Sequence, residues 1–268
     1  MDQLANFSTG GGVNEKPTAP ILEFDPAEQA ILQPHPVQLS QAAPPRAVLC
    51  FFQDVINRLR RKGRLKVIGR LKSEIGPNPL YVLEENGQPL LVAHPGVGAP
   101  LSAGFLEEII ALGVDRFIAA GGCGVIDHSI DAGHPLILTS AVRDEGVSYH
   151  YLPPGREVSA SPAAVAALQA TLEAANMPYS LAKAWTTDGI YRETVARRAR
   201  RLAEGCQVVE MEAAAFFAVA QFRRVTFGQL VYGGDLVVPE GWDSRSWHKR
   251  ADDRERIFWL AVQACLRL

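Results

Sequence analysis

Residues 208–220 of the chain read VVEMEAAAFFAVA. The two valines form a short apolar run, and Glu210, Met211 and Glu212 separate it from an alanine-rich segment without Gly or Pro. This pattern predicts a buried strand that runs into a helix, with two carboxylates at the junction. An ionised carboxylate only accepts hydrogen bonds, so the pair suits a ligand with two neighbouring hydroxyl donors, such as a ribose cis-diol. Alternatively, one or both acids only place negative charge in the first helical turn.

Strand-like and helical runs continue on both sides of this junction. The strand-like runs are Ala47–Phe51, Lys66–Gly69, Leu80–Leu83, Leu90–His94, Arg116–Ala120, Pro135–Val142, Gln207–Val209 and Gly228–Tyr232. The helical patterns are Asp54–Lys62, Leu101–Leu112, Ser161–Asn176, Glu193–Ala203, Ala213–Gln221 and Asp252–Leu268. The early strands are close together, as in hairpins, whereas the later strands alternate with helices. The sequence therefore predicts an α/β fold, a three-layer domain with a central mixed β-sheet flanked by helices.

Composition argues against several classes of protein. The 268 residues carry a formal net charge of −2, so nucleic acid and acidic membrane surfaces are not indicated as partners. The longest apolar runs are shorter than the roughly 18 residues that a membrane span needs, and the first residues, MDQLANFSTGGG, do not resemble a secretory signal. Four scattered cysteines form no C-x-x-C pair, which argues against a zinc site or a disulfide framework. We therefore expect a cytoplasmic protein without a metal site.

Residues 1–46 differ in composition from the rest of the chain. They contain TGGG at residues 9–12, several prolines and few periodic apolar positions. We interpret residues 1–20 as a mobile tail and residues 21–46 as an extended segment that lies on a neighbouring surface. Residues 47–268 are then expected to form a single domain.

The string EMEAAA after an apolar strand resembles the signature of the nucleoside phosphorylase and nucleosidase family, whose members cleave the N-glycosidic bond of nucleosides. The sequence HPGVGAPLSAG at residues 94–104 resembles the Gly-x-Gly-x-Pro-Ser turn of that family, and residues 141–150 resemble its core strand and loop. The resemblance covers roughly residues 47–240. It implies the fold expected above, a catalytic domain, a nucleoside substrate and no cofactor.

The resemblance also implies the parts of a ribose site. Met211 matches a residue that packs on the sugar, and Glu212 matches an acid that binds the ribose hydroxyl groups, with Glu210 beside it. His35, in the sequence Gln-Pro-His-Pro, matches a His that crosses to a neighbouring subunit and contacts the 5′-hydroxyl. A homo-oligomer is therefore implied, either a dimer or a trimer of dimers.

Asp235 follows an apolar strand and two glycines in the sequence YGGDLV at residues 232–237. In purine-acting members of the family an Asp at this place protonates N7 of the departing base, which lowers the barrier to its departure. The alternative is an Asp that only stabilises a turn or caps a helix. Residues 192–197 do not reproduce the Gln and Arg with which uridine phosphorylases read uracil, so a purine is favoured.

The resemblance places four more residues beside the base. Ile190 and Tyr191 match the pair that packs on the base, unless both are simply core residues. Gly121 and Gly122 belong to the neighbouring strand and are also expected at the base. The run from Trp242 to Arg250 is interpreted either as a flap over the base or as a solvated loop.

Three phosphate-binding features of the family's phosphorylases are missing. The first strand runs into residues 50–54 without a Gly-Asp-Pro loop, Ala119 replaces an Arg, and Gly122 replaces a Ser or Thr. Gly98 and Arg143 remain as candidates for an anion contact, with Arg192 as a further source of charge. Because each lost Arg would have made charge-assisted bonds to phosphate, the departures favour hydrolysis.

Asp54 stands where the nucleosidase branch of the family has a Glu that orients the attacking water. A carboxylate there could align or deprotonate water beneath the anomeric carbon. The alternative is that Asp54 caps the helix that follows it. Three hypotheses remain open: a purine nucleoside hydrolase that uses water, a phosphorylase with a rebuilt phosphate site, and a non-catalytic nucleoside-binding module.

Overall fold

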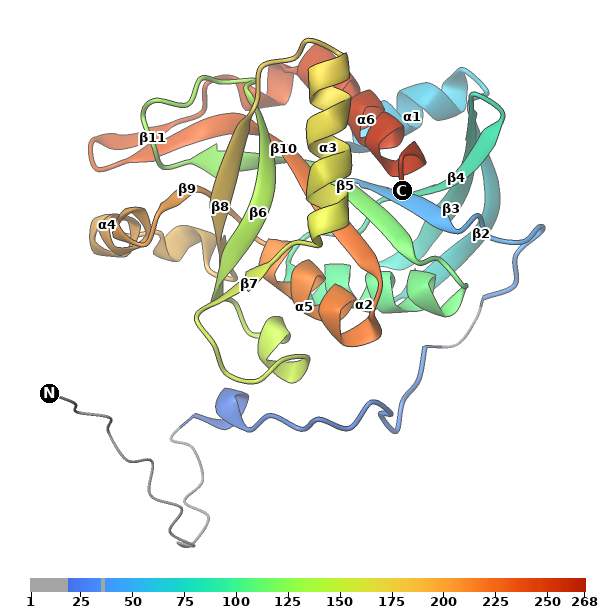
Figure 1. Cartoon of the computed structure of the whole chain (residues 1–268), viewed down its shortest axis with the longest axis horizontal. Helices are drawn as coiled ribbons and strands as arrows, with labels where there is room; N and C mark the ends of the chain where they lie inside the picture. Colours follow the sequence, from blue (N-terminus) through green and yellow to red (C-terminus); the bar gives the residue numbers. More distant parts are fainter. Residues whose placement is uncertain (1–18, 35–36) are drawn as a thin grey trace, which may run out of the picture.

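The computed structural model describes residues 19–34 and 37–268 (Figure 1). The described strands are β1 (Arg46–Cys50), β2 (Leu65–Ser73), β3 (Gly76–Glu85), β4 (Gln88–Ala93), β5 (Arg116–Val125), β6 (Pro135–Asp144), β7 (Glu157–Ser159), β8 (Ser180–Thr187), β9 (Cys206–Glu210), β10 (Thr226–Val238) and β11 (Gly241–Asp243). The described α-helices are α1 (Gln53–Arg61), α2 (Ala99–Ala111), α3 (Pro162–Ala174), α4 (Val195–Ala203), α5 (Ala213–Arg223) and α6 (Ala251–Leu266). Short 3-10 helices are η1 (Pro20–Leu22), η2 (Val147–His150), η3 (Ile190–Arg192) and η4 (Trp247–Lys249).

The described strands form one mixed sheet in the order β11-β10-β6-β8-β9-β5-β1-β4-β3-β2, with β7 paired to β6. β1 lies between β4 and β5 and is parallel to both. β10 is antiparallel to β6 but also pairs in parallel with β5, which closes β10, β6, β8, β9 and β5 into a ring. The predicted α/β fold with a mixed sheet is confirmed, whereas the ring was not predicted.

Helices cover both faces of the sheet, so the predicted three layers are present. α2 and α5 pack with one set of buried side chains, and α1, α3 and α6 pack with the other set. Strand β1 contributes side chains to both sets. Ala47 and Leu49 belong to the first set, and Val48 and Cys50 belong to the second, because successive side chains of a strand point to opposite faces. Figure 1 shows α3 and α6 on one side of the strands and α2 and α5 on the other.

Residues 141–150 contain the end of a strand and a loop with a short 3-10 helix, as the resemblance implied. β6 ends at Asp144, and residues 147–150 form η2, so His150 is not part of a strand. The hydroxyl of Tyr149 donates a hydrogen bond to the carbonyl oxygen of Arg143 at 2.9 Å, which closes the turn. His150 lies away from the main cavity and lines a smaller one beside the N-terminal segment.

The described part of the N-terminal segment lies against the rest of the chain. Val37, Leu39 and Ala43 pack on the core, and the amide of Ser40 donates to the carbonyl of Ile68 in β2 at 2.8 Å. Farther upstream, Glu28 pairs with Arg224 at 2.6 Å. Residues 1–18 of the expected tail, and His35, lie outside the described residues.

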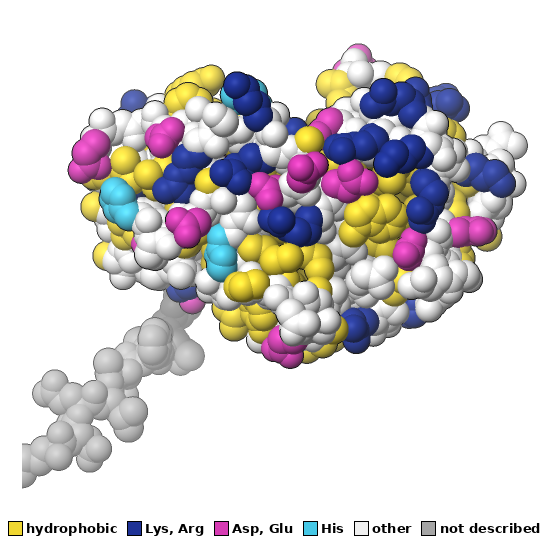
Figure 2. Space-filling model, turned by 90° about the horizontal axis from the view of Figure 1, so that it is seen from above, with side chains coloured by type: hydrophobic (Ala, Val, Ile, Leu, Met, Phe, Trp, Pro, Cys, Tyr) yellow, Lys and Arg dark blue, Asp and Glu magenta, His cyan; other side chains and the backbone are white. Residues whose placement is uncertain are grey.

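Acidic and basic side chains are interspersed over the face of the molecule that Figure 2 presents. No helix in the described part of the chain is long and apolar enough to cross a membrane. All four cysteines are buried and free.

Candidate active site

Three strands that pair with β5 lead into one cavity of about 1070 Å³. β1 continues into Phe51–Asp54, β9 continues into Glu210–Glu212, and β10 contributes Asp235 near its end. β5 itself supplies Gly122–Gly124 to the wall. Glu212 and Asp235, which are 23 positions apart in the sequence, therefore line the same cavity.

Glu210 is buried, and both of its carboxylate oxygens already accept hydrogen bonds. Oε1 accepts from the hydroxyl of Thr186 at 2.5 Å, while Oε2 accepts from the amides of Glu212 and Ala213 at 2.8 and 2.7 Å. These two amides open α5, so Glu210 satisfies N–H groups that a helix cannot pair internally. Glu210 therefore holds the start of α5, and because it also lines the cavity, its expected ribose contact remains a prediction.

Glu212 is held at the cavity by the turn that precedes α2. The amide of Gly98 donates to Oε1 of Glu212 at 2.6 Å, and Gly98 has φ +87°, which a residue with a side chain rarely adopts. Burial, together with the negative charge of Glu210, raises the pKa of Glu212. The predicted anion contact of Gly98 is corrected, since this amide is already bonded to a carboxylate. Met211 lies between the two acids in the sequence and lines the cavity.

Asp235 is oriented by an aromatic side chain from the hairpin that follows it. The indole N–H of Trp242 donates to Oδ2 of Asp235 at 2.6 Å. Ile190 and Tyr191 line the same cavity and are 53% and 95% exposed, so the alternative of core residues is wrong for both. These side chains form one part of the cavity wall, which we call the base end because the family resemblance implies a base there.

Glu193 also lines the cavity, although sequence analysis did not single it out. It lies in the turn between η3 and α4. Burial, followed by the negative charge of Asp235, raises the pKa of Glu193 to about 7. The base end therefore contains two carboxyl groups rather than one.

Asp54 is the second residue of α1, and it makes no capping hydrogen bond because the N-cap position is Phe52. The alternative role of a helix cap is therefore wrong. Its Oδ1 lies 3.3 Å from Nη1 of Arg254 in α6, and its Oδ2 lies 3.9 Å from Nη2 of Arg58. Asp54 thus lines the cavity as one half of an ion pair.

The places where the sequence lacks phosphate-binding residues are filled by other groups. Ala119 is fully buried in the sheet, between Leu49 and Gln229 of the adjoining strands. At Gly122 a Cβ atom would lie 3.2 Å from the ring of Tyr232, so this ring occupies the space that a Ser or Thr would use. Among the described residues that line the cavity, Arg254 is the only basic one.

Gly121 does not line the cavity, which corrects its expected place beside the base. A Cβ atom at Gly121 would lie 3.1 Å from the ring of Phe51, so that ring separates Gly121 from the open space. Its neighbour Gly122 does line the wall.

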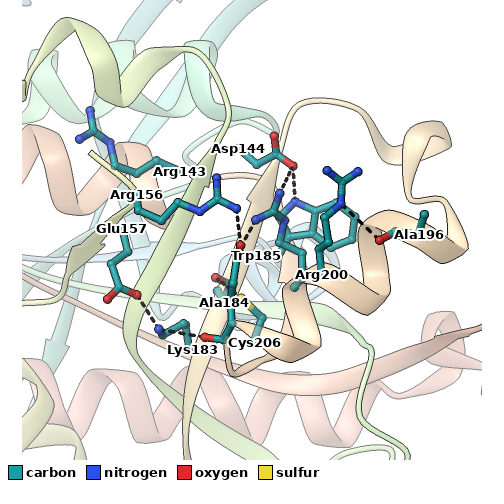
Figure 3. A network of polar contacts seen from close by, with 12 residues as sticks. Arg143, Asp144, Arg156, Glu157, Lys183, Ala184, Trp185, Ala196, Arg200 and Cys206 are labelled. Carbon is teal, nitrogen blue, oxygen red and sulfur yellow. Dashed lines mark hydrogen bonds and ion pairs between the residues drawn. The ribbon is translucent and has the colours of Figure 1, made fainter. Parts of the chain in front are cut away.

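Arg143 does not reach the cavity, so its predicted phosphate contact is wrong. Its guanidinium donates to the hydroxyl of Ser148 at 2.9 Å and to the carbonyls of Pro153 and Leu152 at 2.7 and 3.1 Å. It also stacks on the ring of Tyr149, 4.3 Å from its centre. In Figure 3 the guanidinium of Arg143 points away from the neighbouring ion pairs. Arg192, the other suggested source of charge, is exposed and does not line the cavity.

Helix α4, which follows the base end, is anchored by two buried arginines. Arg198 donates to the carbonyls of Ile126 and Val237 at 2.6 and 2.8 Å. Arg201 pairs with Glu204 at 2.5 Å and lies 3.7 Å from Asp144 of β6. Figure 3 shows Asp144 also accepting from the indole of Trp185 in β8, at 2.8 Å. These bonds anchor α4, which follows the segment that carries Tyr191 and Glu193.

Sequence reasoning did not name Tyr232, Trp247 or Arg254 individually, although all three line the cavity. Trp247 falls in the run that was interpreted as a flap or a solvated loop, and no pattern in that run separates the two. Arg254 lies on the terminal helix, whose apolar stripe predicts packing alone. Its guanidinium lies 5.4 Å above the ring of Trp247 and 3.4 Å from the hydroxyl of Tyr232.

Comparisons with known proteins agree with this architecture. The family model of the Phosphorylase superfamily matches residues 45–258. The chain is 43% identical to a uridine phosphorylase of Haemophilus influenzae over 68 residues, which are 25% of this chain and 27% of that protein. It is 30% identical to a uridine phosphorylase of Treponema pallidum over 189 residues, 66% of this chain and 72% of that protein. A crystal structure of purine nucleoside phosphorylase from Toxoplasma gondii with immucillin-H superposes with a TM-score of 0.74 at 19% identity, covering 88% of this chain and 99% of that one.

Proposed function

The chain belongs to the phosphorylase superfamily, and on that premise we propose that it is an enzyme that hydrolyses the N-glycosidic bond of a purine nucleoside. In this proposal the bond to the base breaks ahead of attack, which leaves positive charge on the ribose. Glu212 binds the ribose hydroxyls and Met211 packs on the sugar. Asp235 protonates the departing base. Water, aligned by Asp54, then adds to the anomeric carbon.

One observation carries the preference for water over phosphate. Arg254 is the only basic side chain among the described residues of the cavity wall, and Asp54 lies 3.3 Å from it. The carboxylate neutralises the arginine and would itself repel an incoming phosphate, since like charges at close range disfavour each other. The same carboxylate suits a water molecule, which needs an acceptor for its proton.

The proposed purine preference rests on Asp235. Its carboxyl group lies in the cavity with Ile190 and Tyr191, where a flat base could pack against the two side chains. A purine ring carries an acceptor nitrogen that a carboxyl group can protonate as the bond breaks. General acids of this kind contribute roughly 10²–10⁴-fold to a rate.

A second candidate is a phosphorylase that binds phosphate in an altered way. The relatives that are named uridine phosphorylase favour it. In that case Arg254 would have to exchange Asp54 for phosphate when the anion enters. The two candidates differ in the fate of the ribose, which is released free by a hydrolase and as ribose 1-phosphate by a phosphorylase.

The test is to incubate the protein with inosine, adenosine, guanosine and uridine, each with and without inorganic phosphate, and to quantify base, ribose and ribose 1-phosphate. We expect free ribose from a purine nucleoside at a rate that phosphate does not increase. Strict dependence on phosphate, with ribose 1-phosphate as the product, would overturn the hydrolase proposal. Binding of a nucleoside that stays intact would instead favour a non-catalytic module, and Asp235→Asn would then leave the affinity almost unchanged.

A further inference from the structure

We propose that Trp242 is a positioning residue for base departure: its indole N–H keeps Oδ2 of Asp235 as a hydrogen-bond acceptor, so that Oδ1 carries the proton that the base receives. The inference deepens the proposed function and rests on it, because it assigns the proton to one oxygen of the acid and names the residue that selects this oxygen.

The antiparallel hairpin of β10 and β11 brings the two side chains together. Val237 of β10 pairs with Trp242 of β11, and Val238 pairs with Gly241 beside the turn. Because alternate residues of a strand share a face, Asp235 lies on the same face as Val237 and diagonally from Trp242. All three side chains line the cavity. An aromatic side chain is long enough to bridge such a diagonal, and Nε1 of Trp242 lies 2.6 Å from Oδ2 of Asp235.

The indole N–H can only donate a hydrogen bond, and this restricts where Asp235 can carry a proton. While Oδ2 accepts from Trp242, an added proton belongs on Oδ1. Oδ2 also faces the wall of the cavity, since a Cβ atom at Gly124 of β5 would lie 3.6 Å from it. In the part of the chain that the structure describes, no donor contacts Oδ1. Oδ1 is therefore the oxygen that is free to serve the base.

A neutral donor suits an acid that must hold a proton before it transfers one. A cation at the same distance would favour the ionised carboxylate and oppose its protonation. The guanidinium of Arg245, three residues after Trp242, instead donates to the carbonyl of Ile130 at 2.8 Å, and Arg254 pairs with another carboxylate of the cavity wall. Within the described residues, no basic side chain forms an ion pair with Asp235.

Packing alone does not explain a tryptophan at this position. The side chain of Trp242 is 64% exposed, so its ring adds little to the apolar area that folding buries. It belongs to none of the three apolar clusters that the described residues form. Its one polar atom is bonded to Asp235. Removal of the N–H should therefore affect the reaction more than the stability of the fold.

The proton balance of the step needs no reactant besides the nucleoside and water. As the C–N bond breaks, its electrons go to the base, and the base nitrogen takes the proton from Oδ1. Asp235 is left as a carboxylate whose Oδ2 still accepts from Trp242. Water adds to the ribosyl cation and releases one proton, which returns to Asp235 through solvent. The net reaction is nucleoside plus water to ribose plus base.

The first test is a double-mutant cycle on the cleavage of a purine nucleoside, with phosphate added if turnover requires it. Trp242→Phe keeps an aromatic ring but removes the donor. We expect it to lower kcat by about 10- to 100-fold, as for the loss of a hydrogen bond to a charged group, with little change in KM or melting temperature. Asp235→Asn should lower kcat by roughly 100-fold or more. The double variant should lose no more than Asp235→Asn, because Trp242 acts through that acid.

Two comparisons separate positioning from a general change of the site. A purine nucleoside with a methyl group on N7 already carries the positive charge that the proton would supply, so Trp242→Phe should cleave it about as fast as the wild type. Trp259→Phe makes the same substitution in α6, away from the cavity, and should keep the activity of the wild type. Additive losses in the cycle, or an equal loss on the methylated nucleoside, would overturn the inference.

The second test detects the contact without turnover. In a proton–nitrogen correlation spectrum, the indole resonance of Trp242 is the one that disappears in Trp242→Phe. It should move upfield in Asp235→Asn, because an amide oxygen accepts more weakly than a carboxylate, while the resonance of Trp259 stays in place. An unmoved Trp242 resonance would overturn the contact.

The outcomes distinguish this inference from the function on which it rests. A wild type that cleaves no nucleoside, with or without phosphate, would overturn the proposed function and the use of the proton with it. An active wild type whose kcat is unchanged in Trp242→Phe would overturn the role of Trp242 alone.

Discussion

Glu210 and Glu212 are separated by one residue, but the structure gives them different partners. Glu210→Ala removes the acceptor for two amides at the start of α5 and for the hydroxyl hydrogen of Thr186. We expect this change to lower the free energy of unfolding by about 1–3 kcal/mol. Glu212→Ala removes a buried acid whose pKa is raised, so we expect a smaller loss of stability but a decrease in kcat/KM of about 10- to 100-fold. Urea unfolding and steady-state kinetics measure the two effects, and a reversed ranking would contradict the roles assigned to these acids.

Ala119 lies where a phosphate-binding Arg is missing, and its surroundings predict that the Arg cannot simply be restored. The residue is fully buried among apolar side chains. Ala119→Arg would place an unpaired charge there, which costs roughly 3–5 kcal/mol, so we expect a large drop in melting temperature and no gain of phosphate dependence. Ala119→Ser serves as the control and should remain close to the wild type in stability. A stable Ala119→Arg protein that requires phosphate would show that the cavity can still accept the anion.

Residues that the sequence singled out through a short motif lie on the wall of one cavity, while their roles remain predictions. Glu212, Asp235, Asp54 and Tyr191 all line the cavity, and each follows directly from a strand end or a matched string. The sequence could not show that Arg143 is unable to contact phosphate. Its guanidinium is bonded to Ser148 and to carbonyl groups of the loop after η2, and nothing in the local sequence indicates those bonds. Arg254 was missed for a similar reason, since its place at the cavity depends on how α6 packs against β10 and α1.

Substitutions in α4 can show whether the anchoring of this helix affects nucleoside binding at the base end. Arg198→Ala leaves the carbonyls of Ile126 and Val237 without their charged donor, so we expect a loss of about 2–3 kcal/mol in the free energy of unfolding. Because Glu193 lies two residues before α4 and lines the cavity, we also expect a higher KM for the nucleoside. Arg200→Ala, on the exposed side of the same helix, should change stability by less than about 0.5 kcal/mol. An unchanged KM in a clearly destabilised Arg198→Ala protein would argue that the base end does not depend on α4.

The six described α-helices agree with the sequence patterns to within two residues at each end, whereas β5 and β10 run five and six residues past their predicted ends and three strands were missed. β8 has the sequence SLAKAWTT, in which small and polar residues hide the apolar signal. Ala182 and Ala184 are nevertheless buried in one apolar cluster and Trp185 in another. β7 and β11 are three residues long each, too short for a periodic pattern. Strand order could not be predicted at all, since the pairing of β10 with β5 joins segments about a hundred positions apart.

The closed ring of β10, β6, β8, β9 and β5 explains how distant motifs meet in one place. β5 pairs with β1, β9 and β10, and each of these strands delivers a proposed site residue to the same cavity. A local sequence pattern can therefore single out Glu212 or Asp235 as candidates, but it cannot show that the two side chains line the same cavity. The expectation of a single domain over residues 47–268 remains a prediction, and it can be tested through the segment that precedes β1.

Two truncations separate the contributions of the N-terminal segment. A chain that begins at Val37 keeps Val37, Leu39 and Ala43 on the core and the bond from Ser40 to Ile68, but loses the exposed pair of Glu28 and Arg224. Such exposed pairs contribute about 0–1 kcal/mol, so this chain should unfold close to the full-length protein. A chain that begins at Arg46 also loses the three partly buried side chains, and we expect a further loss of roughly 2–4 kcal/mol.

For a protein of this size each kcal/mol lowers the melting temperature by about 2–4 °C, so calorimetry separates the two chains. The chain from Arg46 should still unfold in one cooperative transition, because the buried clusters on both faces of the sheet consist of residues from Ala47 onward. Loss of that transition would mean that residues 37–45 are part of the folding unit, and the domain boundary would then have to move upstream.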